Sequence, residues 1–249
     1  MFLCIIKSKL TFRESQNSKN MSTLSRTENR VLTFQARDAL RGKWRLGVGA
    51  AAVYFLLMIV VQFLSLVIGI SIAGSSPSEE SLKFFTEIIN ILLSLLIDGP
   101  MAAGLAFFTL SLSRKQNTRL SQLFNGFNIY GLCVGTYILQ SIFIFCWSLL
   151  LLVPGIIATL SYSMAYFIIT EDNSITPLEA ITKSKEMMRG NKWKFFCLQL
   201  RFFGWGVLCV FTLGVGFLWL IPYSLVSHAQ FYDDLKENNG ATFAAQITS

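Results

Sequence analysis

Four long apolar runs, separated by short polar segments, dominate the pattern of the chain. The first run extends from Leu46 to Gly74, contains no acidic or basic residue, and exceeds the roughly 20 residues that a helix needs to cross a bilayer core. The other three runs follow at 84–112, 129–170 and 195–232. Their only acidic, basic or histidine residues are Glu87, Asp98, Arg201 and His228. Such a pattern is typical of a chain that crosses a membrane several times.

The runs predict helices, because a backbone amide in hydrocarbon must find its hydrogen-bond partner within its own segment. Divided at their glycines and prolines, they yield about six transmembrane helices. We expect these helices near 46–72, 84–112, 129–151, 152–170, 195–213 and 215–233. The predicted fold is therefore an all-α, polytopic membrane helix bundle.

Composition supports this prediction, since 53% of the residues are hydrophobic and only 14% are charged. Lys and Arg concentrate before the first helix, between the second and third, between the fourth and fifth, and after the sixth, whereas only Lys83 lies on the opposite side. The positive-inside rule then places both termini in the cytoplasm of a bacterial cell, with the protein in the inner (cell) membrane. We attribute the net charge of +7 to this topology and to attraction between the basic residues and anionic lipid headgroups, rather than to nucleic-acid binding.

A short motif recurs along the chain. "ARDALRGKW" from Ala36 resembles "SKEMMRGNKW" from Ser184, and "LSQLFNGF" from Leu120 is a fainter copy that keeps the glycine. Each glycine is followed by apolar helix and then by a proline. We interpret the chain as three degenerate hairpin repeats, each an amphipathic interfacial helix on the cytoplasmic surface followed by a transmembrane hairpin. The three prolines are expected at helix kinks or turns: Pro100, Pro154 and Pro222.

The glycine of each stronger copy is expected to turn the chain into the bilayer. Thr176, Pro177 and Glu179 predict a capped helix that Gly190 ends with a positive φ. Ser25 and Glu28 predict a similar capped start for the N-terminal copy, whose arginines Arg30, Arg37, Arg41 and Arg45 fall on one helical stripe.

Basic and tryptophan residues beside these glycines are candidates for lipid anchoring at the interface. They are Arg41, Lys43, Trp44, Arg45, Arg189, Lys192, Trp193 and Lys194. Two interpretations stay open: a bend with an anchor and no ligand, or a specific site for anionic headgroups.

Several motifs resemble one bacterial family. They are "ARDALRGKW", "LFNGF", "WSLLLLVPGIIATLSYSMAYFII", "EAITKSKEMMRGNKWKFFCLQL" and "GVGFLWLIPYSLVSHAQFYDDL". Between about Glu28 and Glu237 the chain is similar to the integral membrane family known as domain of unknown function 975. The resemblance implies a multi-helix membrane protein without an established activity or defined site residues.

The chain contains few residues that could act in catalysis. His228 is the single histidine, and the five cysteines show no CxxC spacing, so we expect buried free thiols, no cofactor or metal, and no enzymatic activity. Asp98 and Arg201 lie farthest inside apolar runs, where a charge costs roughly 2.5 to 3.5 kcal/mol. They could pair as an intramembrane polar site; alternatively, Arg201 extends to the cytoplasmic surface and Asp98 caps the helix portion that begins at Pro100.

Three segments are expected: a tail at 1–24 that is disordered or precedes a translation start at Met21, a membrane domain at 25–237, and a flexible tail at 238–249. The favoured function is that of a non-enzymatic accessory or scaffold protein associated with anionic lipids, and a membrane-protein partner is a further candidate. The alternative is a small-molecule or ion transporter or channel subunit that uses the interrupted helices.

Overall fold

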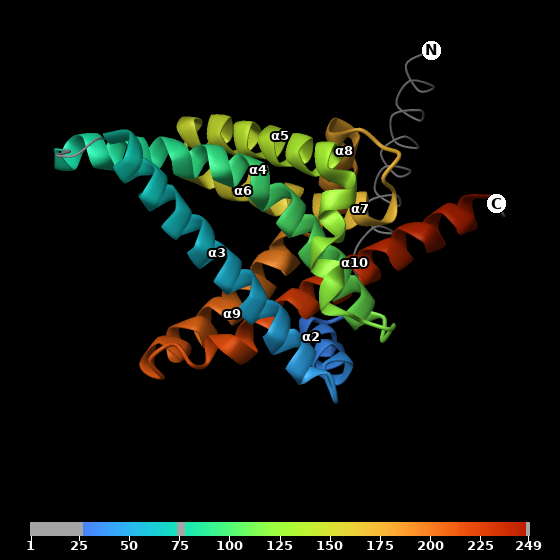
Figure 1. Ribbon diagram of the computed structural model, residues 1–249. Helices are drawn as coiled ribbons and strands as arrows, with labels where there is room; N and C mark the ends of the chain where they lie inside the picture. Colours follow the sequence, from blue (N-terminus) through green and yellow to red (C-terminus); the bar gives the residue numbers. More distant parts are fainter. Residues whose placement is uncertain (1–26, 74–77, 248–249) are drawn as a thin grey trace, which may run out of the picture.

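The computed structural model describes residues 27–73 and 78–247 (Figure 1). Within these residues all regular structure is helical and no strand occurs, so the all-α prediction is confirmed. The helices are α2 (Asn29–Ala39), α3 (Trp44–Ala73), α4 (Glu79–Ser113), the 3-10 helix η1 (Leu120–Ile129), α5 (Tyr130–Leu150), α6 (Leu152–Tyr162), α7 (Ala165–Glu171), α8 (Pro177–Met187), α9 (Lys192–Phe211) and α10 (Phe217–Ile247).

Five segments among the described residues are long and apolar enough to cross a membrane. They are Trp44–Ile72, Glu79–Ser113, Leu120–Leu150, Val153–Glu171 and Lys192–Phe211. The prediction of a membrane helix bundle is confirmed, with one span fewer than the six expected. The sixth expected helix forms the first half of α10, whose apolar part ends at Tyr232 and so covers about 24 Å at 1.5 Å per residue. This is shorter than a hydrocarbon core of about 30 Å.

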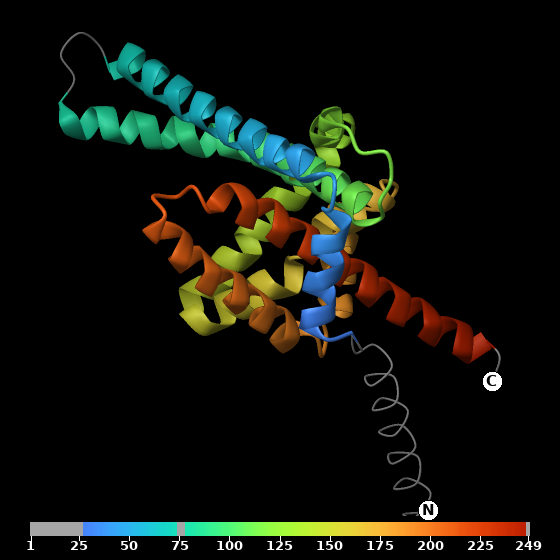
Figure 2. The same cartoon turned by 90° about the horizontal axis from the view of Figure 1, so that it is seen from below.

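Three helical hairpins point their tips in the same direction. The tips between α3 and α4, between α5 and α6, and between α9 and α10 all lie toward the left in Figures 1 and 2, which share this horizontal axis. The helices α2, α7 and α8 lie toward the opposite ends of the hairpins. Each hairpin follows one of the three motif glycines, while the internal sequence repeat itself stays a prediction.

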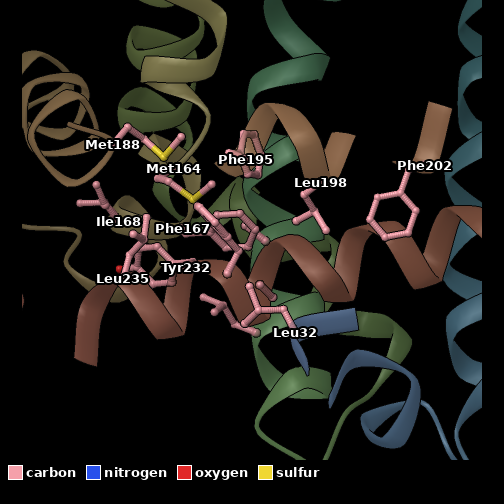
Figure 3. Close-up of a cluster of buried hydrophobic side chains, with 14 residues drawn as sticks. Leu32, Met164, Phe167, Ile168, Met188, Phe195, Leu198, Phe202, Tyr232 and Leu235 are labelled. Carbon is pink, nitrogen blue, oxygen red and sulfur yellow. The ribbon is translucent and has the colours of Figure 1, made fainter. Parts of the chain in front are cut away.

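The largest cluster of buried side chains lies around α10, at the ends of the hairpins opposite their tips. Figure 3 shows Leu32 from α2, Phe167 from α7, Leu198 from α9 and Tyr232 from α10 converging there. The rings of Phe167 and Tyr232 stack at 5.3 Å between centroids. Because lipid tails offer little hydrophobic driving force between helices, such close packing is what holds membrane helices together. The cluster therefore fastens the short helices to the hairpins.

Glycines let α4 and η1 approach with their backbones in contact. A Cβ atom on Gly126 would lie 1.9 Å from the carbonyl oxygen of Pro100, and one on Gly104 would lie 1.7 Å from that of Leu123. Such close approach is the usual reason for small residues at membrane helix interfaces. The glycine of "LFNGF" therefore serves helix packing, and its φ is not among the positive values.

The predicted corner at Gly190 is confirmed. The Thr176 hydroxyl accepts a hydrogen bond from the backbone N–H of Glu179, the Glu179 carboxylate accepts one from the N–H of Thr176, and Pro177 is the first helical residue. Gly190 has φ +82° and Gly42 has φ +79°. Both glycines adopt the left-handed conformation that ends a helix and redirects the chain.

The start of the N-terminal copy differs from the prediction. Here α2 begins at Asn29 with Glu28 as N-cap and no side-chain capping hydrogen bond, so Glu28 does not complete a capping box; Ser25 lies outside the described residues. Since α2 ends at Ala39, Arg41 and Arg45 do not continue its stripe of arginines.

The prolines occupy two kinds of position. Pro100 lies inside α4 and Pro222 inside α10, whereas Pro154 falls in the first turn of α6, next to the hairpin tip. At the chain ends, the expected tail at 1–24 lies outside the described residues. The segment from 238 onward continues α10 as a helix to Ile247.

Candidate functional site

A cavity of about 590 Å³ lies between α2, α9 and α10. One part of its lining is basic, with Arg30 and Arg37 from α2 and Arg201 from α9. Arg30 and Arg37 are seven residues apart, so they lie on one face of α2 together with Thr33 and Phe34. The amphipathic spacing of α2 therefore determines that both arginines border the same space.

Arg201 extends toward α2 from an apolar stretch of α9. Its Nη1 atom donates a hydrogen bond to Thr33 Oγ1 at 3.3 Å. The Thr33 hydroxyl donates in turn to the backbone oxygens of Asn29 and Arg30, each at 3.0 Å. Across residues 27–73 and 78–247, no ion pair involves Arg30, Arg37 or Arg201. Three guanidinium groups thus border the cavity without a carboxylate partner in this part of the chain.

The remaining lining of the cavity is mainly apolar and aromatic. Trp205 and Cys209 come from α9, Trp219 and Tyr223 from α10, and Trp44 from the start of α3. On α9, Trp205 and Cys209 follow Arg201 at intervals of four residues, which places all three on one face. The cavity consequently combines a basic part with an apolar wall.

The residues proposed as interfacial anchors do not gather into one site. Beside Gly42, Lys43 donates from its Nζ to the backbone oxygen of Gln116 at 2.8 Å, Trp44 is half-buried, and Arg45 is exposed. Arg41, in the same turn, is also exposed. Of this group only Trp44 lines the cavity.

The corner at Gly190 has different surroundings. Trp193 is 74% exposed and stacks on Phe196 at 5.5 Å between ring centroids. Lys194 lies 3.6 Å from an Asp234 carboxylate oxygen and 5.7 Å from the centre of the Phe231 ring. Arg189 is exposed and Lys192 is half-buried. Lys194 therefore connects the start of α9 to the middle of α10.

The structure does not bring Asp98 and Arg201 together. Asp98 Oδ2 accepts a hydrogen bond at 3.1 Å from the hydroxyl of Tyr137 on α5, whereas Arg201 contacts Thr33 on α2. Because α4 continues unbroken through Pro100, Asp98 is not the N-cap of a separate helix. The expected paired site is replaced by a carboxylate–tyrosine contact between α4 and α5.

A network of charged residues, which the sequence analysis missed, joins α4, α7 and α10. Arg114 Nη2 lies 2.6 Å from both Glu171 Oε1 and Asp233 Oδ1, and Lys236 Nζ lies 2.7 Å from Glu171 Oε2. The hydrogen bond to Asp233 holds the pKa of the Arg114 guanidinium above its ordinary value. No local spacing could reveal this network, because its members come from the ends of α4 and α7 and from the middle of α10.

Titratable groups elsewhere form no metal-binding cluster among the described residues. The His228 Nε2 atom lies 3.1 Å from Gln199 Oε1, which gives this ring a polar contact on α9. Cys133 and Cys209 are buried free thiols as expected, Cys197 is half-buried, Cys146 is exposed, and Cys4 lies outside the described residues.

The helices and their apolar surfaces define an all-α, multi-pass membrane protein. Residues 149–239 match the profile of the family described as "Protein of unknown function (DUF975)". The resemblance seen in the sequence is thereby confirmed over a segment that includes α9 and most of the apolar wall of the cavity. Comparisons with curated proteins and with solved structures found no match.

Proposed function

We propose that this chain is a non-enzymatic protein of the bacterial cell membrane that associates with anionic lipid at the cytoplasmic surface and organises lipid or partner proteins there. One observation carries the proposal: the hairpin tips all point one way, and α2 and α8, each followed by a basic corner segment (41–45 and 189–194), lie toward the opposite ends. Lys83 is the single basic residue near the first tip, where Glu79 lies 3.8 Å away. This asymmetry is the one that the positive-inside rule associates with a cytoplasmic face.

Topology provides the first test. Reporter fusions are placed within the 74–78 connection, within the 172–176 connection and after Ser249. We expect the first outside the cell and the other two in the cytoplasm. Although the apolar part of α10 is short, the helix continues to Ile247 and so returns the chain from the tip of the third hairpin to the side of α2. An external position of the 172–176 connection would refute the proposal.

Lipid association provides the second test. Arg41 and Arg189 are exposed and flank the two corner glycines, so replacing both by Gln removes basic charge from the proposed cytoplasmic face. Each basic residue near an anionic surface contributes about 1 kcal/mol, so each replacement should lower the enrichment of anionic lipid about fivefold. The enrichment is measured by lipid analysis of the protein purified in native nanodiscs.

Lys83→Gln is the matched control, because Lys83 is an exposed cation near the opposite ends of the hairpins. It should leave the lipid composition unchanged. Equal effects of Lys83→Gln and of the double replacement would contradict the proposed sidedness.

A transporter or channel subunit is the second candidate. It is favoured by Asp98, a carboxylate within an apolar helix that contacts Tyr137 near Pro100. Neither of the two cavities found around α10 is lined by Asp98. Solute flux into proteoliposomes that Asp98→Asn abolishes would favour this candidate over the lipid-associated protein.

A further inference from the structure

The geometry points to the cavity between α2, α9 and α10 as a binding site for one anionic phospholipid. Its phosphate would lie against Arg30, Arg37 and Arg201, and one acyl chain would follow the aromatic wall of α9 and α10. This inference rests on the proposed association with lipid, and it specifies the site and the class of ligand.

The basic part of the cavity suits a phosphate group. A guanidinium can donate two parallel hydrogen bonds to phosphate oxygens, which an ammonium group cannot do with the same geometry. Arg201 lies within an apolar helix, where an unneutralised charge is costly, and among the described residues its one hydrogen-bond partner is the hydroxyl of Thr33. Arg30 and Arg37 approach the same space from α2 and increase its positive potential. An anion would therefore compensate three cations at once.

The apolar wall distinguishes a lipid from a soluble phosphate. From Arg201 to Cys209 the wall extends about 12 Å along α9 at 1.5 Å per residue. Trp219 and Tyr223 on α10 form the facing side. A soluble phosphate compound would occupy only the basic part and leave this aromatic surface uncovered. An acyl chain attached to the phosphate would cover it.

The floor of the cavity is buried, whereas its rim is exposed. Phe202 is buried, packs edge-to-face against Tyr223 at 5.4 Å between ring centroids, and lies at one end of the core cluster in Figure 3. Trp205 is 56% exposed and Trp219 51%, and exposed apolar side chains lie close to each of them in sequence, such as Phe203 on α9 and Leu218 on α10. The opening therefore lies on the surface that faces lipid, so a phospholipid can enter from the side. A volume of about 590 Å³ is within the usual range for small-molecule sites and would enclose the phosphate and part of one chain.

The direct test measures lipid preference with the full chain in detergent micelles. Native mass spectrometry counts bound lipid after addition of phosphatidylglycerol, phosphatidylcholine or soluble glycerol phosphate. We expect phosphatidylglycerol to be retained about tenfold more tightly than phosphatidylcholine, and glycerol phosphate not to displace it. Displacement by glycerol phosphate would identify a soluble phosphate site and overturn the inference, as would equal retention of the two lipids.

Replacement of the arginines locates the site. The pair Arg30→Gln and Arg37→Gln changes only exposed residues of α2, and Arg201→Gln removes the third guanidinium. Each variant should abolish most of the preference for phosphatidylglycerol. Should Arg201→Gln fail to fold, the exposed pair on α2 alone decides the outcome.

The Arg41→Gln and Arg189→Gln variant separates this inference from the proposed function, since neither residue lines the cavity. If that variant loses anionic lipid enrichment while the two cavity variants, the α2 pair and Arg201→Gln, bind lipid normally, the cavity inference fails and the proposed function stands. If no variant changes lipid enrichment, both fail.

A brominated phospholipid tests the position of the acyl chain. Bromine quenches tryptophan fluorescence on contact, so phosphatidylglycerol brominated in one chain should quench the wild-type chain more than a Trp205→Phe variant. Equal quenching of the two proteins would show that the chain does not follow α9, and would overturn the proposed pose.

Discussion

The corners at Gly42 and Gly190 share a sequence motif and a backbone conformation but differ in their surroundings. Both glycines have positive φ and both precede an apolar helix. Beyond Gly42, Trp44 lines the cavity together with the arginines of α2, which form no ion pair within the described ranges, whereas beyond Gly190, Trp193 is largely exposed. The motif thus determines the bend, while the neighbouring helices determine whether the basic residues remain available to a ligand.

The helices that lead into the two corners show the same contrast. On α8, the fully buried Ser184 accepts a hydrogen bond from the Met164 N–H at 3.1 Å and donates to the Ser161 carbonyl at 2.8 Å. Lys183 on that helix lies 3.6 Å from Asp172. On α2, Thr33 instead accepts a hydrogen bond from Arg201 at the cavity. We interpret α8 as mainly structural and α2 as one side of a binding site.

The largest effect is expected at the third motif glycine, Gly126. Unlike the two corner glycines it does not have a positive φ, and it lies at a helix contact. Gly126→Ala places a Cβ atom 1.9 Å from the Pro100 carbonyl, so η1 and α4 must separate. We expect the free energy of unfolding to fall by at least about 3 kcal/mol, the upper end of the usual cost of overpacking, and little folded protein to be recovered. The yield and thermal stability of the detergent-solubilised chain measure it. Gly131→Ala, where no atom lies within 4 Å, is the control and should fold normally.

A smaller effect is expected at Ser184, where the structural role of α8 can be tested. Ser184→Ala leaves the buried Met164 N–H and Ser161 carbonyl without this partner, at a cost of about 1 to 3 kcal/mol. Unfolding in sodium dodecyl sulfate measures the change. Thr182→Ala on the exposed face of the same helix is the control, since its hydroxyl donates only to the Leu178 carbonyl. Equal costs for the two variants would contradict the buried anchoring role of α8.

The corner glycines themselves should respond alike. Gly42→Ala and Gly190→Ala each force a non-glycine residue into the left-handed region at a cost of about 1 to 2 kcal/mol. At Gly42 a Cβ atom would meet nothing within 4 Å, so the cost there comes from the left-handed backbone conformation alone. Asparagine should cost less than alanine at both positions. Thermal unfolding of the four variants would reject the shared conformation if only one corner responded.

The smallest effect is expected from pH, through Asp38 on the helix before the Gly42 corner and Asp172, which pairs with Lys183 on the helix before the Gly190 corner. The hydrogen bond from Lys115 lowers the pKa of Asp38, and the hydrogen bonds from Ser174 lower the pKa of Asp172. Each carboxylate therefore contributes stability above its unfolded pKa of about 3.9, and this contribution is lost as the pH falls through the lower folded value.

Salt distinguishes the two aspartates. Asp38 forms a charge pair with Lys115 at 2.6 Å, which salt screens, whereas Asp172 accepts hydrogen bonds mainly from Ser174. Asp38→Asn should weaken the salt dependence of thermal unfolding, and Asp172→Asn should leave it nearly unchanged. The reverse order would show that the Lys115 pair does not connect α2 to the 114–119 connection.

Local patterns along the chain predicted the helical class, the capped start of α8 and the positive φ of Gly190. The uncharged run 46–74, for example, requires a helix because no other spanning structure pairs its backbone groups within the segment. The same reasoning overestimated α10, since a run of apolar residues does not reveal how far a helix extends across the bilayer. The arginine stripe of α2 was visible, but nothing near Arg30 or Arg37 in sequence indicated α9 as the other side of a cavity.

The sequence by itself determined that this chain folds as membrane helices with basic corners, because hydrophobicity, capping and glycine conformation act within a few residues. Only the tertiary structure decided that Asp98 meets Tyr137, that Arg201 meets Thr33, and that Arg114 joins Glu171 and Asp233. These contacts depend on the rotation and offset of helices about their axes. Packing between distant segments sets both quantities, and no local pattern records them.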